Sequence, residues 1–135
     1  MKPAVVVDSA VLLALWDTDD PQHQAATAAL ERHLAAGSRL IVPVTTLTEV
    51  LVGAFRATPY AVRTVEGFVE DLVGEVRPTD RAVGRAAAKL LAEHPTLALA
   101  DALLLATGEV VGAQDVLTTN PHLEQVDQRV RVLTS

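Results

Sequence analysis

Short apolar runs alternate with amphipathic segments along the chain, and this alternation is what most constrains its fold. The runs are "AVVVDS", "RLIVPV", "EVRP", "QDVLTT" and "VRVLT", which are typical of short strands bounded by polar residues. Segments with helical patterns lie between most of them. Strands that alternate with helices form a parallel sheet with short loops and right-handed crossovers. The sequence therefore predicts an α/β fold with a doubly wound, mainly parallel central sheet flanked by helices.

Proline, glycine and capping residues indicate where the helices begin and end. Asp20 before Pro21 predicts the start of a helix that stops at Gly37. Thr79 and Thr96 are the expected caps of two later helices. Further helices are expected over residues 10–16, 45–57, 59–74 and 97–112.

The length and composition indicate a single domain over residues 1–135. Half of the residues are hydrophobic and only 3% are aromatic, so the core must consist of Ala, Val and Leu. The chain has no cysteine, which excludes disulfides, thiolate metal sites and cysteine nucleophiles. No apolar run approaches the roughly 18 residues of a membrane span. We expect a soluble, cytoplasmic protein.

The formal net charge of −6 argues against a protein that coats nucleic acid with a basic surface. It does not exclude a nuclease, because divalent cations held by acidic residues can supply positive charge at a scissile phosphate.

Three acidic residues are embedded in apolar sequence: Asp8 after "AVVV", Glu49 in "LTEVLV" and Asp101 in "LALADALLLA". An acid buried without a partner costs several kcal/mol, roughly, so each needs compensation. If both helices begin at the sheet edge where the first strand ends, the three carboxylates converge there. Such a cluster repels itself unless it holds a cation, and its oxygen ligands suit Mg²⁺ or Mn²⁺.

Each acid also has a purely structural interpretation. Asp8 can be the N-cap of the following helix. Glu49 can complete a capping box with Thr46. Asp101 is harder to explain in this way, because it lies beyond the first turn if Thr96 is the cap. One shared metal site explains all three positions.

The segments "VVVDSAVLLAL", "LIVPVTTLTEVL", "LALADALLLAT" and "VLTTNPHL" resemble, in order and spacing, the motifs of PIN-domain ribonucleases, in particular the VapC-type toxins of toxin-antitoxin systems. The resemblance extends from Val5 to the final strand. It implies a Rossmann-like PIN fold, with Asp8, Glu49 and Asp101 at the positions of three catalytic, metal-binding acids.

The resemblance departs from the family pattern at a fourth acid. Family members usually carry T-x-D after a strand, whereas "TTN" here places Thr118 at the polar position and Asn120 where the aspartate is expected. An amide oxygen can ligate a metal but adds no negative charge. Asn120 can also cap the turn before Pro121. Thr118 and Ser9 are supporting candidates that could bind water or phosphate, or act only as cap and turn residues.

The resemblance implies an endoribonuclease that uses Mg²⁺ or Mn²⁺ to hydrolyse RNA phosphodiesters. A cognate small antitoxin that places a basic residue in the acidic pocket, and a homodimer, are also expected. The alternative is a PIN-like binding or regulatory module that is weakened at Asn120.

The remaining polar residues have less specific interpretations. The four histidines lack metal-ligand spacing and are expected at the surface; they are His23, His33, His94 and His122. The cationic stripe of Arg81, Arg85 and Lys89 fits a solvated helix face better than an RNA guide. Trp16 is expected in the core or in an interface.

Overall fold

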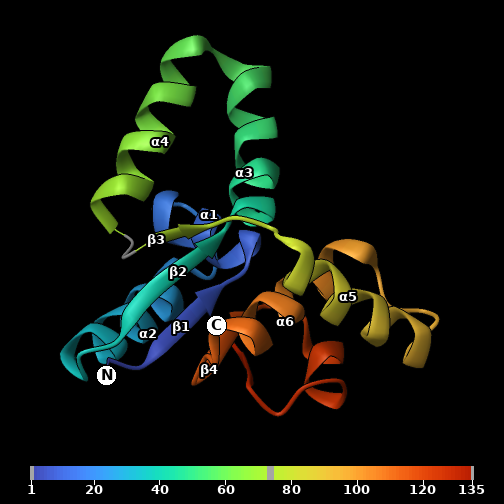
Figure 1. The fold of residues 1–135 in the computed structure, drawn as a ribbon. Coiled ribbons are helices and arrows are strands. Elements are labelled where there is room, and N and C mark those ends of the chain that lie inside the picture. The colour runs from blue at the N-terminus through green and yellow to red at the C-terminus, as the bar shows by residue number, and fades with distance from the viewer. Residues whose placement is uncertain (1, 73–74, 135) are drawn as a thin grey trace.

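The computed structural model (Figure 1) describes residues 2–72 and 75–134. Within these ranges it contains one sheet with the strand order β3-β2-β1-β4-β5, in which all neighbouring strands are parallel. The strands are β1 (Ala4–Val7), β2 (Arg39–Pro43), β3 (Glu75–Arg77), β4 (Asp115–Thr118) and β5 (Val130–Val132). The predicted doubly wound α/β architecture is confirmed.

Helices cover the sheet and connect its strands. They are α1 (Ser9–Trp16), α2 (His23–Ala35), α3 (Val44–Ala57), α4 (Pro59–Leu72), α5 (Arg81–Glu93), α6 (Leu99–Val111) and the 3₁₀ helix η1 (Pro121–Gln125). The end predicted for α4 at Gly74 lies outside the described residues. Within the described residues, no helix combines the length and the apolar character that crossing a bilayer requires.

Two predicted helix starts are wrong. Asp20 does not cap α2, because its carboxylate accepts the N–H of Gln22 at 2.7 Å and forms a turn that delays the helix to His23. Thr79 does not cap α5, because Asp80 accepts the N–H of Val83 at 3.0 Å. A carboxylate at this position also interacts favourably with the helix dipole. Thr79 and Asp80 are adjacent and both residue types can cap a helix, so the local sequence does not decide which of them does.

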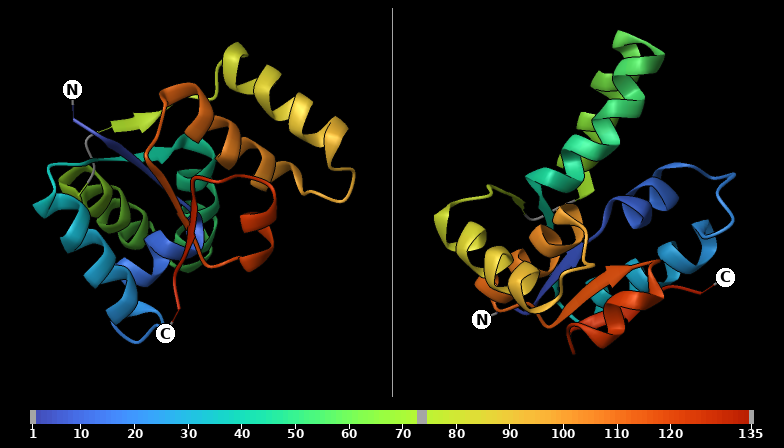
Figure 2. Two further views of the ribbon diagram at one scale, coloured as in Figure 1. Left: turned by 90° about the horizontal axis from the view of Figure 1, so that it is seen from below. Right: turned by 90° about the vertical axis from the view of Figure 1, so that its right-hand side faces the viewer.

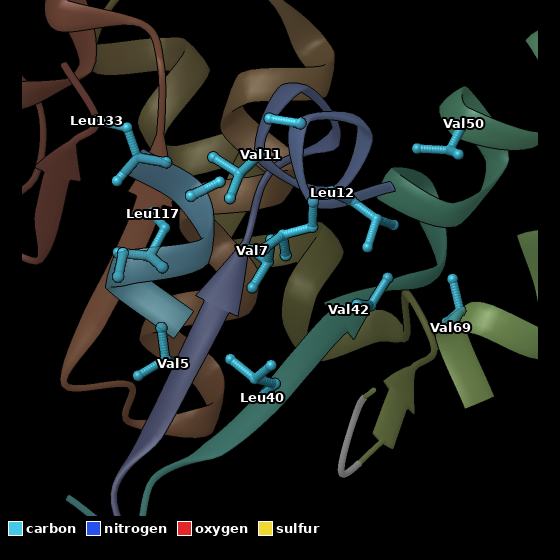
Figure 3. Packing of buried hydrophobic residues seen from close by; sticks show 14 of the residues in the cluster. Val5, Val7, Val11, Leu12, Leu40, Val42, Val50, Val69, Leu117 and Leu133 are labelled. Atoms are coloured by element: carbon cyan, nitrogen blue, oxygen red, sulfur yellow. The ribbon is translucent and has the colours of Figure 1, made fainter. Parts of the chain in front are cut away.

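Each face of the sheet is closed by its own set of helices. Alternate strand residues such as Val5, Val7 and Leu117 point into a core formed with α1, α2, α3 and α4 (Figure 3). The residues between them, such as Val6 and Val116, pack against α6 and η1 on the opposite face. Helix α5 then packs on the outer side of α6, as the two views of Figure 2 show. The central strands β1, β2 and β4 are buried on both faces, as their apolar sequences predict, whereas the edge strands β3 and β5 are partly exposed.

Helices α3 and α4 form a hairpin whose far end rises away from the sheet (Figures 1 and 2). Its inner side packs into the core through Val50, Ala54, Val65 and Val69. Its tip exposes Phe55 and Tyr60, with 71% and 69% of their surface accessible. The hairpin therefore presents large apolar side chains to its surroundings.

The strand order places a topological switch point beside β1. From β1 the chain crosses to β2 on one side of the sheet, while β4 flanks β1 on the other side. Ligand sites in such sheets lie outside the carboxyl ends of the strands at this point. The functional site is therefore expected where β1 and β4 end.

Candidate active site at the carboxyl edge of the sheet

Asp8 follows β1 directly and is held by hydrogen bonds from two directions. Its Oδ1 accepts the N–H of Ser9 at 2.7 Å, so Asp8 caps α1. Its Oδ2 accepts the hydroxyl of Thr118, the last residue of β4, at 2.7 Å. The backbone N–H of Asp8 also donates to Leu117 O at 2.9 Å. Asp8 is therefore both a helix cap and a carboxylate fixed at the junction of β1 and β4.

Thr118 connects Asp8 to Asn120. Its side chain is fully buried, and its Oγ1 accepts the backbone N–H of Asn120 at 3.1 Å while it donates to Asp8. The Oδ1 of Asn120 accepts the N–H of His122 at 3.0 Å and caps η1. The interpretation of Asn120 as a cap is thus confirmed. Asn120 is half-buried, and its backbone is bonded to Thr118, the residue that donates to Asp8.

Glu49 lies in the second turn of α3. The helix begins at Val44 after Pro43, with no side-chain cap, so the predicted capping box between Thr46 and Glu49 is wrong. The Thr46 hydroxyl instead donates to Val7 O at 3.2 Å and ties α3 to the end of β1. Sequence reasoning missed this role of Thr46, whose only signal is a polar residue within an apolar stretch. Glu49 has no part in capping and is free for another function.

Asp101 lies in the first turn of α6, because the helix begins at Leu99 with Ala98 as its N-cap. The expectation that Thr96 caps the helix, and that Asp101 therefore lies beyond the first turn, is wrong. Residues 95–97 form a turn closed by the Leu97 N–H to His94 O hydrogen bond, and only Ala98 is extended before the helix forms. A first-turn acid interacts favourably with the helix dipole, which compensates part of the cost of its half-buried carboxylate. The helix start also points Asp101 to the edge where β1 ends.

The three acids influence one another electrostatically. Burial raises the pKa of Asp101, and the charge of Asp8 raises it further. Burial of the carboxyl group also raises the pKa of Glu49, followed by the charge of Asp8, while a hydrogen bond with the Ser9 side chain opposes the shift and Asp101 adds to it. Perturbed carboxyl groups gathered in this way are typical of functional sites. The three carboxylates therefore lie near enough to one another for their charges to interact.

No cation balances this charge within the described ranges. The ion pairs found there involve other acids: Asp115, Glu75, Asp80 and Asp127. In the same part of the chain, no three acidic or imidazole groups stand close enough to form a complete metal-binding cluster. The donor set itself, carboxylates with amide and hydroxyl oxygens nearby, has the hard-oxygen character that Mg²⁺ and Mn²⁺ prefer. The residues therefore fit a divalent ion in type, although the three carboxylates do not form a complete cluster as they stand.

The other polar residues differ in part from expectation. Only His122 of the four histidines is exposed. The ring of His23 contacts Ala14 O at 2.7 Å, and His33 lies 3.6 Å from the Asp115 carboxylate; both are half-buried structural residues. The predicted exposure of the Arg81, Arg85 and Lys89 stripe is confirmed. Trp16 packs edge-on against Phe68 with ring centroids 5.2 Å apart.

The fold and the site together define a parallel α/β domain with uncompensated carboxylates at its topological switch point. The profile of the PIN domain matches residues 5–129, and this chain belongs to the PIN domain family. The predicted resemblance is thereby confirmed. A comparison with curated proteins gave no match.

Solved structures with the same fold come from toxin-antitoxin systems. A toxin-antitoxin complex from Klebsiella pneumoniae aligns with a TM-score of 0.77 at 20% identity over 95% of this chain and 96% of that one. VapBC2 from Rickettsia felis, bound to a promoter DNA fragment, aligns with 0.77 at 11% identity over 97% and 99%. Mycobacterium tuberculosis VapC20, a toxin that cleaves the sarcin-ricin loop, aligns with 0.70 at 18% identity over 90% and 93%.

Proposed function

We propose that this protein is a divalent-metal-dependent endoribonuclease, the toxin of a toxin-antitoxin pair, acting in the cytoplasm. The observation that carries the proposal is that, in a PIN domain, the charges of Asp8, Glu49 and Asp101 interact, while the ion pairs found among residues 2–72 and 75–134 involve other acids. Hydrolysis forms a bond from a water oxygen to phosphorus and breaks the bond from phosphorus to the leaving ribose oxygen. A bound Mg²⁺ or Mn²⁺ supplies positive charge at the phosphate and acidifies the attacking water.

The chain's own residues hold this arrangement in place. Asp8, Glu49 and Asp101 are the proposed ligands, and Asn120 contributes an amide oxygen at most, since its Oδ1 already accepts one hydrogen bond. Thr118 and the backbone of Ser9 fix the orientation of Asp8. Supporting hydrogen bonds of this kind orient metal ligands and tune their affinity. The catalytic residues are thus set by β1, α3 and α6, and the support by β4.

Cleavage of RNA by the purified protein tests the proposal. We expect cleavage with Mn²⁺ or Mg²⁺ and no cleavage with chelator. The rate should fall by roughly 100-fold or more in Asp8→Asn and Asp101→Asn, because loss of even a supporting residue lowers the metal affinity or activity of a site about 10- to 100-fold. Glu49→Gln should also slow cleavage. Its control is Glu66→Gln, which replaces an exposed acid on α4 and should cleave like the wild type. Equal cleavage by the wild type, Asp8→Asn and Asp101→Asn would overturn the proposal in favour of a binding or regulatory module.

An apolar surface beside Glu49 supports the antitoxin partner. Two shallow hollows of about 390 and 250 Å³ follow α3, and the second is shared by Glu49 with Leu99 and Leu103 of α6. Leu99 and Val52 expose 62% and 42% of their surface. We propose that an antitoxin segment covers these apolar side chains and places a basic residue near the carboxylates. Leu99→Ser should weaken toxin-antitoxin affinity in a titration, and unchanged affinity would remove this surface from the interface.

A homodimer remains part of the proposal. Phe55 and Tyr60 at the tip of the α3–α4 hairpin are available for contact with a second copy. Analytical ultracentrifugation of the wild type and of Phe55→Ser should show a dimer that the substitution weakens. A wild type that sediments as a monomer over the whole concentration range would contradict it.

A further inference from the structure

A cavity of about 510 Å³ opens beside the carboxylates, between the α5–α6 connection and η1. Asp101 and Asn120, both candidate active-site residues, are part of its lining. His94, His122 and Gln125 line the same cavity. The cavity therefore adjoins the proposed site of phosphodiester cleavage.

The lining of this cavity has an uneven chemistry. Its apolar part comes from Leu97, Leu123 and Val126, which belong to or pack against the core on that face of the sheet. Asp101 is the only carboxylate in the lining, and the remaining polar side chains are neutral amides, a hydroxyl and imidazoles. A nucleobase matches this lining, because it combines uncharged flat faces with a hydrogen-bonding edge. Proteins bind unstacked RNA bases with aromatic rings and with polar contacts to the base edge.

The polar side chains of this cavity have hydrogen-bonding groups to spare. His122 and His94 use their backbone N–H groups, which donate to Asn120 Oδ1 and Leu90 O. Within residues 2–72 and 75–134, the hydrogen bonds found do not use the imidazole rings of these residues or the amide of Gln125. His122 and Gln125 are exposed. Their side chains can therefore contact a ligand without breaking a contact of the fold.

A second cavity of about 560 Å³ lies further along α5 and α6 and provides a contrast. Its lining carries the cations Lys89 and Arg129 but also three acids, one of which, Asp127, is 3.5 Å from Arg129. It touches none of the three converging carboxylates. With five charged side chains in its lining, it offers no comparable site for an uncharged base.

We propose that the cavity beside Asp101 holds the base of the nucleotide adjacent to the scissile phosphate, with Gln125 bonding the base edge and the His94 and His122 rings contacting its face. This inference rests on the proposed ribonuclease function and names the specificity-determining residues of that site. It makes the cleavage preference of the enzyme depend on η1 and on the α5–α6 connection.

Steady-state cleavage of four RNA oligonucleotides that differ in one nucleotide beside the cleaved bond tests the inference. Gln125→Ala should change the preference among the four bases by roughly 10-fold, as expected for one lost edge contact. His122→Ala should raise KM roughly 5- to 100-fold with kcat nearly unchanged, because a stacking contact is lost, and His122→Phe should restore KM. Gln128→Ala, which lines the second cavity, is the matched control and should behave like the wild type.

Nucleotide binding separates this inference from the proposed function. Adenosine, guanosine, cytidine and uridine 5′-monophosphates are titrated into the wild-type protein, and the imidazole proton signals of His94 and His122 are followed by NMR. Shifts that saturate, and that Gln125→Ala weakens, support the base site even if no RNA is cleaved. If RNA is cleaved while Gln125→Ala and His122→Ala keep the preference and KM of the wild type, the base site is wrong and the ribonuclease function stands. Absence of both saturable shifts and cleavage overturns both.

Discussion

The hydroxyl of Thr118 makes two hydrogen bonds at the carboxyl end of β4, one to the Asp8 carboxylate and one from the backbone of Asn120. Because Thr118 is fully buried, neither bond can be replaced by water. A carboxylate that is held in this way keeps one orientation whether or not a cation is bound. At the scale of single residues, the precision of the site therefore depends on a side chain that is not itself a ligand.

Thr118→Val removes both hydrogen bonds and keeps the shape of the side chain. We expect a loss of stability of about 1–3 kcal/mol, because a buried N–H and a carboxylate lose their partner, and a roughly 10- to 100-fold loss of metal affinity or activity. Urea denaturation and Mn²⁺ titration measure the two effects. Thr118→Ser, which retains the hydroxyl, should restore metal affinity, and failure to do so would assign the effect to packing.

Asn120→Asp tests whether the missing fourth acid limits the site. Aspartate retains the oxygen that accepts the His122 N–H and is as good a cap as asparagine, so η1 should stay intact. An additional charge near a divalent ion contributes on the order of 1–4 kcal/mol, and Mn²⁺ affinity should rise about 10-fold or more in calorimetric titration. Asn120→Ala is the control that loses the cap without gaining charge. Equal Mn²⁺ affinities for the wild type and Asn120→Asp would place residue 120 outside the ion's reach.

The position of Asp101 depends on how helix α6 packs on the sheet, and this packing depends on Gly108. A Cβ at this position would approach the Cγ2 of Val116 on β4 to 2.7 Å. Val116 is fully buried and β-branched, so it cannot turn aside. The glycine therefore allows α6 to pack closely on β4. The same contact fixes the position of α6, and with it the position of Asp101 relative to the carboxyl edge of the sheet.

Gly108→Ala should destabilise the protein by about 1 kcal/mol, because overpacking costs about 2 kcal/mol, the middle of its usual range, and the gain in helix propensity is about 1 kcal/mol. Gly53→Ala in α3, where nothing lies within 4 Å of the added Cβ, should instead stabilise by about 0.5–1 kcal/mol. Thermal unfolding of both variants gives the comparison. Stabilisation in both would show that α6 can shift on the sheet without cost.

Element types could be read from the sequence, whereas several element starts could not. The strand ending before Asp8 and the α6 segment have the expected identity because their apolar patterns are long and consistent. The predicted caps Asp20, Thr79 and Thr96 are wrong: Asp80 takes the place of Thr79, and α2 and α6 begin without a side-chain cap. For Asp101 this error mattered, because a shift of the helix start from Thr96 to Ala98 moves the acid into the first turn.

At the scale of the whole molecule, the net charge of −6 includes carboxylates that the fold brings together at a cost. The raised pKa values of Glu49 and Asp101 mean that the folded protein binds protons more strongly than the unfolded chain at mildly acidic pH. Their contribution to stability is therefore fully present below their unfolded pKa values of about 4 and is lost as pH rises through the folded ones. At neutral pH without metal, the two acids oppose folding.

Asp101→Asn should accordingly raise the melting temperature at pH 7 in the presence of chelator, and the difference from the wild type should shrink as pH falls towards 4. With Mn²⁺ the order should reverse. Mn²⁺ at 100 times its Kd adds about 2.7 kcal/mol to the free energy of unfolding of the wild type, which raises its melting temperature by several degrees. The gain for the variant should be smaller. Melting curves across pH 4–7, with and without Mn²⁺, provide both measurements. A wild type that is unaffected by Mn²⁺ would contradict the metal site.

The element order, the parallel sheet and the three candidate acids follow from the sequence alone, because apolar periodicity and isolated charges in apolar segments are local properties. That Thr118 holds Asp8, that Thr46 ties α3 to β1, and that His94, His122 and Gln125 share a cavity with Asp101 follows only from the tertiary structure. These contacts join residues far apart in the chain, and their geometry follows from how helices pack on a sheet. Charges in a sequence can indicate a site, but its shape exists only after the strand order has brought the segments together.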